Sequence, residues 1–279
     1  MVIVPDVPQT VTEVAVHYDE LDTAYRRIWG DHVHHGYWRS GCESAAEAVE
    51  ALVRLVEARL ELEPGHAVCD IGCGYGATAV DLAMRHDVSV LGLTVSLQEH
   101  IAQSRTNTGF TCLRRDWLDN RLPDASFDRV YAIESSEHMV DKQRFFTEAA
   151  RVLRPRGRLV VCAWLEGEAV RPWEVRHLLK PICTEGRLPS MGSRVDYQEL
   201  ASRAGLVLES YEDISRNVRR TWRICLRRLA ARLVTDRAVR RLVMSSATQN
   251  RGFALSLPRL IVVLRTGAMR YGVLVWNKN

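Results

Sequence analysis

Residues 68–77 have the sequence VCDIGCGYGA, in which a short apolar run leads into three glycines at alternate positions. The run predicts a buried strand, and the GATAVDLAMRH that follows has the spacing of an amphipathic helix. Glycine accepts positive φ angles and lets a ligand approach the backbone. A strand, a glycine turn and a helix in this order predict a ligand-binding βα unit, with Gly72, Gly74 and Gly76 as candidate cofactor-binding residues.

Strands and helices continue to alternate after this unit. Apolar runs of strand length are VSVLGL, FTCLRR, FDRVYAI and GRLVVCAW, and helical spacing is found in SLQEHIAQSRTN (96–107) and DKQRFFTEAARVL (141–153). Short apolar strands separated by amphipathic helices indicate a parallel sheet covered on both faces. We therefore expect a doubly wound, Rossmann-like α/β core from about residue 61 to 165.

The flanking regions are more helical. Residues 11–58 have helical spacing, interrupted by a glycine-punctuated loop at WGDHVHHGYW (29–38). Near the C-terminus, residues 195–215 predict a helix and a strand, and RYGVLVWNK (270–278) predicts a last strand. The segment between them, about 216–262, is then a helical insertion.

Composition limits the class of protein. With 279 residues, 47% hydrophobic and 26% charged, the chain suits a globular fold. It contains no apolar run of membrane-spanning length and no signal-peptide pattern, and its seven cysteines form no C-x-x-C pair, so we expect a cytoplasmic protein. A net charge of +4 without a recognised reader motif argues against nucleic acid as a partner.

The acidic residue beside the glycines suggests what the loop binds. Asp70 would pair poorly with a pyrophosphate but well with an ammonium or sulfonium group, and the next strand ends in Thr94 without the acid that an NAD site uses for its ribose. Thr94 and Gln98 could serve a ribose, and Asp116 and Trp117 could bind an adenine amine and ring. These residues suit S-adenosylmethionine better than NAD, although an NAD-linked oxidoreductase stays an alternative.

The glycine motif and further segments resemble a known family. DIGCGYG is similar to motif I of class I S-adenosylmethionine-dependent methyltransferases, and YAIE is similar to a motif of sterol C-methyltransferases. Segments that resemble the γ-tocopherol C-methyltransferase family are IWGDHVHHGYW, GLTVSLQ, YAIESSEHMVDKQRF, RPWE, LPSMGSRVDY and GAMRYGVLV. The resemblance therefore runs nearly end to end.

This resemblance implies an architecture and a reaction. It implies a seven-stranded sheet with an antiparallel last strand, an N-terminal helical lid (1–60), and a core (61–279) with a cap inserted at about 216–262. It also implies methyl transfer from S-adenosylmethionine to a small, largely apolar metabolite such as a prenyl compound or quinol. We expect carbon as the methylated atom, with oxygen or nitrogen of an alkaloid or polyketide as the alternative.

Candidate catalytic residues follow the strand FDRVYAI, whose end at Ile133 we expect beside the sulfonium. A phenol or enol would need a general base such as His138, and an alkene would need a carboxylate such as Glu134 to stabilise a cation and remove a proton. For His138 and its neighbour Glu137, helix capping and solvated charge are the alternatives. By the same resemblance, Tyr18 reaches the cofactor carboxylate.

The histidine cluster lacks the spacing of a zinc site, because H-x-H-H provides no i, i+4 pair and no partner motif. We instead expect His32, His35 and Tyr37 to line the substrate side of a lid, with loop packing as the alternative and no metal.

The arginine-rich insertion allows three interpretations. Arg219, Arg223 and Arg227 follow i, i+4 spacing, which indicates a solvated helix face. Alternatively, Trp222 and Leu226 form the apolar side of a helix in weak association with a membrane surface, or the arginines bind a diphosphate.

Overall fold

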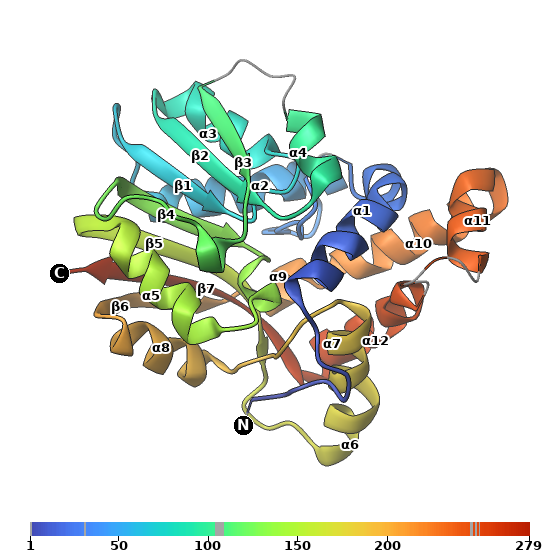
Figure 1. Cartoon of the computed structure of the whole chain (residues 1–279). Coiled ribbons are helices and arrows are strands. Elements are labelled where there is room, and N and C mark those ends of the chain that lie inside the picture. Colours follow the sequence, from blue (N-terminus) through green and yellow to red (C-terminus); the bar gives the residue numbers. More distant parts are fainter. Residues whose placement is uncertain (1, 31, 104–108, 246–247, 249, 251) are drawn as a thin grey trace.

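The computed structural model describes residues 2–30, 32–103, 109–245, 248, 250 and 252–279. Its centre is a seven-stranded sheet of order β3-β2-β1-β4-β5-β7-β6, parallel except for β7, which runs antiparallel to β5 and β6 (Figure 1). The strands are Ala67–Ile71 (β1), Ser89–Thr94 (β2), Phe110–Arg114 (β3), Phe127–Ile133 (β4), Leu153–Glu166 (β5), Leu206–Asp213 (β6) and Met269–Lys278 (β7). The predicted doubly wound α/β fold with an antiparallel last strand is confirmed.

Helices cover both faces of this sheet (Figure 1). On one face, α5 (Lys142–Val152) and α8 (Arg194–Arg203) pack over a core that includes Phe146. On the other, α2 (Ala45–Leu60) and α3 (Ala77–His86) supply the apolar residues. With both faces buried, the parallel strands need the near-continuous apolar sequences from which they were predicted.

The N-terminal region serves two purposes in the structure. Helix α1 (Val11–Ile28) lies at the carboxyl edge of the sheet, where Asp19 accepts hydrogen bonds from the Ser96 hydroxyl at 2.6 Å and the Gln98 amide at 3.1 Å. Those two groups belong to the start of α4 (Leu97–Gln103), so α1 is fixed to the core. Helix α2 packs on the sheet instead. A lid over residues 1–60 therefore stays a prediction, since α1 lies at the carboxyl edge of the sheet and α2 packs on its face.

The C-terminal insertion is helical, as predicted. Between β6 and β7 the chain forms α9 (Ser215–Val218), α10 (Arg220–Thr235), α11 (Arg237–Met244) and α12 (Phe253–Thr266). Of these helices, α10 and α11 contact α1, and α10 to α12 lie at the right of Figure 1 in orange and red. For the predicted helix at 96–107, the structure describes α4 to Gln103, and residues 104–107 lie outside the described residues.

Sequence patterns predicted no element between β5 and α8. The chain there forms α6 (Pro172–Glu174), a π-helical turn η3 (Val175–Leu179) and α7 (Lys180–Glu185), which pack against α12. Shorter turns are η1 (Trp117–Asp119) and η2 (Ser136–His138). Of the helices that the described residues form, none combines the length and apolar character needed to cross a membrane.

Candidate active site

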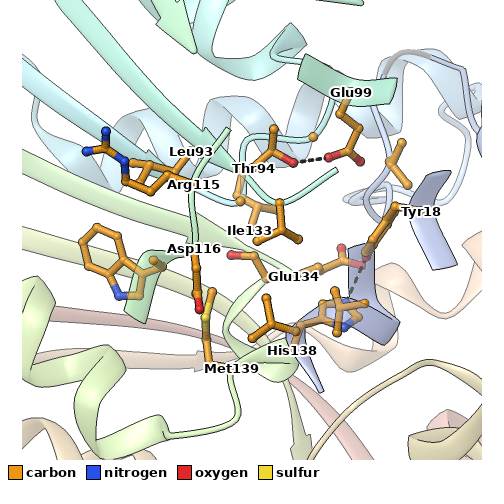
Figure 2. Close-up of a pocket in the computed structure, with 18 residues that line it drawn as sticks. Tyr18, Leu93, Thr94, Glu99, Arg115, Asp116, Ile133, Glu134, His138 and Met139 are labelled. Carbon is orange, nitrogen blue, oxygen red and sulfur yellow. Dashed lines mark hydrogen bonds between the residues drawn. The ribbon is translucent and has the colours of Figure 1, made fainter. Parts of the chain in front are cut away.

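A cavity of about 730 Å³, which we call the edge cavity, opens at the carboxyl ends of β1 to β4. The strand order reverses between β1 and β4, and ligands of open α/β sheets bind where this happens. Figure 2 shows the side chains that surround it. The lining residues are Val11, Val14, Tyr18, Val33, Gly72, Gly74, Leu93, Thr94, Val95, Glu99, Arg115, Asp116, Trp117, Ile133, Glu134, Ser135, His138 and Met139.

The glycine loop forms one wall of the edge cavity. Gly72, Gly74 and Gly76 have φ angles of 76°, 53° and 77°, which glycine adopts without strain. A side chain on Gly72 would collide with Ser135, whereas a side chain on Gly74 would point into open space. Gly76 caps helix α3 and does not line the cavity. The loop thus leaves its backbone accessible to a ligand.

Asp70 lies behind this wall. Its carboxylate is 3% exposed and accepts a hydrogen bond from the Tyr131 hydroxyl at 2.6 Å. Burial raises the pKa of Asp70 to about 7. We expected Asp70 to pair directly with a cationic ligand, but its side chain is bonded to Tyr131 and is not among the residues that line the cavity.

Of the two residues predicted to bind the ribose, the structure places one on the cavity. Thr94 lines the edge cavity, but Gln98 is exposed and does not. Glu99 lines the cavity instead: its carboxylate accepts a hydrogen bond from the Thr94 hydroxyl at 2.6 Å, and burial raises its pKa to about 7. The sequence argument that no acid follows β2 therefore needs correction, because helix α4 turns Glu99 back toward the strand end.

Asp116 and Trp117, the predicted adenine residues, both line the edge cavity. The Asp116 carboxylate accepts the Leu118 amide at 2.9 Å, and the Trp117 indole donates to the Phe145 carbonyl at 3.2 Å, so both side chains are held in place. Met139 and Arg115, which sequence reasoning did not single out, line the cavity beside them. With an open glycine backbone, carboxylates and apolar walls, this lining fits a cationic nucleoside ligand.

Tyr18 and His138 meet at one end of the cavity (Figure 2). The tyrosine hydroxyl lies 2.9 Å from Nε2 of His138, and Nδ1 of the same ring lies 3.2 Å from the Arg187 carbonyl. A carbonyl only accepts, so Nδ1 carries the proton, and the unprotonated Nε2 accepts the hydrogen bond of the Tyr18 hydroxyl. Burial lowers the pKa of His138 to about 4, which keeps the ring neutral at physiological pH.

Glu134 follows Ile133 at the end of β4 with a positive φ of 53°. One carboxylate oxygen accepts the His35 amide at 2.7 Å and the Tyr271 hydroxyl at 2.8 Å. The other accepts His35 Nδ1 at 2.8 Å and the Trp164 indole at 3.3 Å. Burial raises its pKa, but the contacts with His35 outweigh this and hold the pKa of Glu134 below its usual value. Four donors thus fix an ionised carboxylate.

The histidine loop differs from our expectation. Val33 lines the edge cavity, whereas His32, His35 and Tyr37 do not. His35 is turned to Glu134, and Tyr37 packs against the apolar layer around α2 and α3. The Nε2 of His34 lies 3.2 Å from Nδ1 of His32, at a cleft between α2 and α10. Within the described residues, no three His, Cys, Asp or Glu side chains form a group that could hold a metal.

A second cavity of about 480 Å³, which we call the aromatic chamber, adjoins the edge cavity and shares Tyr18, Val33, Glu134 and His138 with it. Its walls are mainly aromatic, so it suits a flat apolar molecule. The remaining lining residues are His17, Tyr25, Trp29, Glu137, Trp164, Gly186, Leu188, Trp222 and Phe253.

Glu137 is not the solvated or capping residue that its sequence position suggested. Its carboxyl group is buried, and it accepts the Trp164 amide at 2.7 Å and the Ser136 hydroxyl at 3.0 Å. Burial raises the pKa of Glu137 to about 7. A carboxyl group that changes charge near neutrality therefore faces the chamber.

The arginine side chains of the insertion lie outside both cavities. Among the described residues, no arginine of the insertion lines the edge cavity or the chamber, so a diphosphate bound by these arginines would lie away from both. A surface groove is lined instead by Arg39, Arg216, Arg219, Arg220, Arg223 and Arg265. Trp222 is 3% exposed and packs against Trp164, so it is not available for a membrane surface.

Comparisons with known proteins agree with this geometry. The family model for mycolic acid cyclopropane synthetase matches residues 6–250. Tocopherol O-methyltransferase of Arabidopsis thaliana is 30% identical over 95% of this chain and 81% of its own length. The 27-O-demethylrifamycin SV methyltransferase of Amycolatopsis mediterranei is 35% identical over 76% of this chain and 80% of its own.

Solved structures share the fold. A mycolic acid cyclopropane synthase complexed with SAH and CTAB superposes with a TM-score of 0.85 at 22% identity, over 98% of this chain and 100% of that one. The cyclopropane synthase MmaA2 of Mycobacterium tuberculosis gives a TM-score of 0.84 at 22% identity, with 98% and 100% covered.

Proposed function

This chain belongs to the mycolic acid cyclopropane synthetase family of S-adenosylmethionine-dependent methyltransferases, and from that premise we propose that it methylates a hydroxyl oxygen of a small, largely apolar aromatic metabolite. The observation that carries the proposal is the unprotonated Nε2 of His138, which accepts a hydrogen bond from Tyr18 at the junction of the edge cavity and the aromatic chamber.

The residues that would hold S-adenosylmethionine surround the edge cavity. Gly72 and Gly74 line this cavity, and the open space where a Gly74 side chain would start lets a ligand approach the loop. Glu99 offers a carboxylate for ribose hydroxyls. Asp116 and Trp117 are our candidates for the adenine, and the Tyr18 hydroxyl for the carboxylate of the amino-acid part. The bound cofactor supplies a methyl group on a sulfonium, a leaving group that needs no further activation.

The protein's part in such a displacement is to align the acceptor, exclude water and take a proton. In the proposed reaction the acceptor oxygen bonds to the methyl carbon while the sulfur–carbon bond breaks and its electron pair stays on sulfur. The hydroxyl proton passes to Nε2 of His138, which must first lose its bond to Tyr18. The fixed negative charge of Glu134 then favours the charged imidazole.

Three observations favour oxygen over the carbon that the sequence suggested. Glu134 already accepts four hydrogen bonds from His35, Trp164 and Tyr271, so it suits electrostatic stabilisation better than proton removal. His138 carries the available electron pair instead. The relative from Arabidopsis thaliana also bears the name of an O-methyltransferase.

Methylation at carbon is the second candidate, and Glu137 is the observation that favours it. Its carboxyl group faces the chamber with a pKa near 7, so it could remove a proton from a ring carbon after methyl transfer.

The chamber and its neighbour favour an apolar acceptor. A third cavity of about 440 Å³ shares Tyr25, Trp29 and Phe253 with the chamber and is lined mainly by apolar side chains of α1, α11 and α12. A substrate whose aromatic ring lies in the chamber could therefore place an apolar substituent in the third cavity, between α1 and the inserted helices.

The test has a binding arm and a transfer arm. Calorimetry should detect S-adenosylhomocysteine binding, and incubation of a phenol panel that includes 1-naphthol and 2-naphthol with methyl-labelled cofactor should yield a methoxy signal by NMR. His138→Ala should lower the rate by about 10²-fold or more, as expected for loss of a general base, with S-adenosylhomocysteine affinity within a few-fold. His177→Ala, an exposed histidine, is the matched control. C-methyl products, or a His138→Ala rate equal to the control, would refute the proposal.

A further inference from the structure

His17 is a buried histidine beside the aromatic chamber that the proposed reaction does not use. Its side chain is 1% exposed, and its two ring nitrogens have different partners. Nε2 lies 2.8 Å from the Tyr25 hydroxyl, and Nδ1 lies 2.6 Å from Nδ2 of Asn250. Asn250, in the insertion between β6 and β7, is thus connected through His17 to Tyr25, and both of these residues lie on α1.

The direction of these hydrogen bonds is fixed at the Asn250 end. Nδ2 of Asn250 also lies 2.7 Å from the backbone carbonyl of Glu185, which can only accept. The amide nitrogen must therefore face that carbonyl, since a flipped amide would bring two oxygens together. Its second hydrogen points at His17 Nδ1, so this ring nitrogen accepts.

The tautomer of His17 then determines the direction of its hydrogen bond with Tyr25. Burial, with smaller contributions from the charges of His138 and Arg187, holds the pKa of His17 well below its usual value, so the ring is neutral. A neutral ring that accepts at Nδ1 carries its proton on Nε2 and donates to the Tyr25 oxygen.

The Tyr25 hydroxyl thus keeps its own hydrogen for another partner. Among the residues that the structure describes, His17 is the hydrogen-bond partner of this hydroxyl, and Tyr25 lines the chamber. The tyrosine side chain is 6% exposed, and leaving a buried hydroxyl hydrogen without an acceptor costs about 1–3 kcal/mol. An oxygen atom of a bound molecule would remove this cost.

We propose that Tyr25 is an obligate hydrogen-bond donor to an oxygen atom of the methyl acceptor, with its direction imposed by the relay from the Glu185 carbonyl through Asn250 and His17. Tyr25 contacts the acceptor, whereas His17 and Asn250 are positioning residues.

This inference rests on the proposed function and narrows the acceptor class. The stacked rings of Tyr18 and Tyr25 have centroids 5.5 Å apart, and their hydroxyls have opposite surroundings. Tyr18 donates to the electron pair of His138, whereas Tyr25 receives a hydrogen bond from His17. An acceptor that matches both positions carries a hydroxyl for His138 and a second oxygen, such as a ketone or ether, for Tyr25.

The relay can be tested without a substrate. In ¹⁵N-labelled protein, His17 should show the neutral tautomer with hydrogen on Nε2 between pH 5 and 8. Asn250→Asp puts a carboxyl oxygen in the place of Nδ2. With its proton bonded to the Glu185 carbonyl, this oxygen can only accept from His17, so the ring hydrogen should move to Nδ1. A wild-type His17 protonated on Nδ1, or a tautomer that is the same in the variant, would overturn the relay.

Binding of a matched pair of probes tests the donor. 1-Tetralone and tetralin share one bicyclic skeleton and differ by a carbonyl. In protein saturated with S-adenosylhomocysteine, 1-tetralone should bind about tenfold more tightly than tetralin, the effect of one hydrogen bond. Tyr25→Phe and Asn250→Asp should abolish this preference without changing tetralin affinity, and Tyr211→Phe on β6 is the control.

The failures of the two proposals are distinguishable. If S-adenosylhomocysteine does not bind, the proposed function fails. If it binds but wild type shows no preference for 1-tetralone, or Tyr25→Phe keeps the preference, the donor role of Tyr25 fails alone. Equal S-adenosylhomocysteine affinities of variant and wild type show that Tyr25→Phe is folded.

Discussion

The Tyr18 hydroxyl donates a hydrogen bond across 2.9 Å to Nε2 of His138 and so connects helix α1 to the group that we propose as the base. Because the bond uses the electron pair that would accept a substrate proton, the base is blocked in this conformation. Tyr18 also lines the edge cavity, so a cofactor carboxylate could attract its hydroxyl and free Nε2. We therefore propose that cofactor binding precedes proton acceptance.

The first prediction concerns the pKa of His138, which is about 4 because the ring is buried. The bond from Tyr18 needs a deprotonated Nε2 and so stabilises the neutral ring. Tyr18→Phe should therefore raise the pKa of His138 by about half a unit to one unit, measured by NMR titration. Tyr75→Phe removes another hydroxyl that joins the core to α1, through Asp22, and should leave this pKa unchanged. A pKa that stays the same or falls in Tyr18→Phe would contradict the blocked base.

A second prediction concerns Glu134. A glutamine has the same shape, but its amide nitrogen would face donors that now contact a carboxylate oxygen. Glu134→Gln should lower the free energy of unfolding by about 3 kcal/mol, as expected when a buried charge partner is removed, and should also slow methyl transfer. Urea unfolding measures the first effect. Glu199→Gln, at an exposed ion pair with Arg203, should change stability by less than about 1 kcal/mol. If the two variants lost the same free energy of unfolding, Glu134 would not anchor the histidine loop to β4.

The third prediction compares two glycines that both have a positive φ angle. Gly74 and Gly65 both have positive φ, at 53° and 84°, and both have open space where a side chain would start. Gly74→Arg and Gly65→Arg should therefore suffer similar backbone strain, but only Gly74 lines the edge cavity. Calorimetry should show that Gly74→Arg loses S-adenosylhomocysteine binding and that Gly65→Arg keeps it. Retained binding in Gly74→Arg would remove the glycine loop from the cofactor site.

Strand and helix order could be predicted because burial on both faces leaves a local pattern. VCDIGCGYGA places its glycines after β1, and the same logic puts Thr94, Asp116 and Ile133 at the ends of β2 to β4, where they line one cavity. The family membership and the relatives' methyltransferase names give no support to the NAD-linked alternative.

The direction of individual side chains could not be predicted, because contacts between distant segments decide it. His35 turns to Glu134 on β4, so Val33 is the loop residue on the cavity. Glu99 reaches the cavity because the first turn of α4 folds back to Thr94. Asn250 contacts His17 from the cap, and neither sequence position predicts the other.

The last prediction concerns pH and Glu99. Burial raises its pKa from 4.5 to about 7 in the folded protein without cofactor. The folded state thus binds this proton more tightly than the unfolded state, so the stabilisation is complete below pH 4.5 and is lost as pH rises to about 7. The loss from this group is on the order of 3 kcal/mol. Asp70 and Glu137 act in the same sense, and His34 and His138, with pKa values lowered to about 4, act in the opposite sense.

The contribution of Glu99 is therefore isolated as a difference between wild type and Glu99→Gln. Urea unfolding at pH 5 and pH 8 should show that wild type loses more stability than the variant over this interval. If ribose hydroxyls donate to the Glu99 carboxylate, S-adenosylhomocysteine affinity should rise with pH through about 7 in wild type and less in Glu99→Gln. Identical pH profiles of the two proteins would show that Glu99 does not titrate in this range and is not the ribose partner.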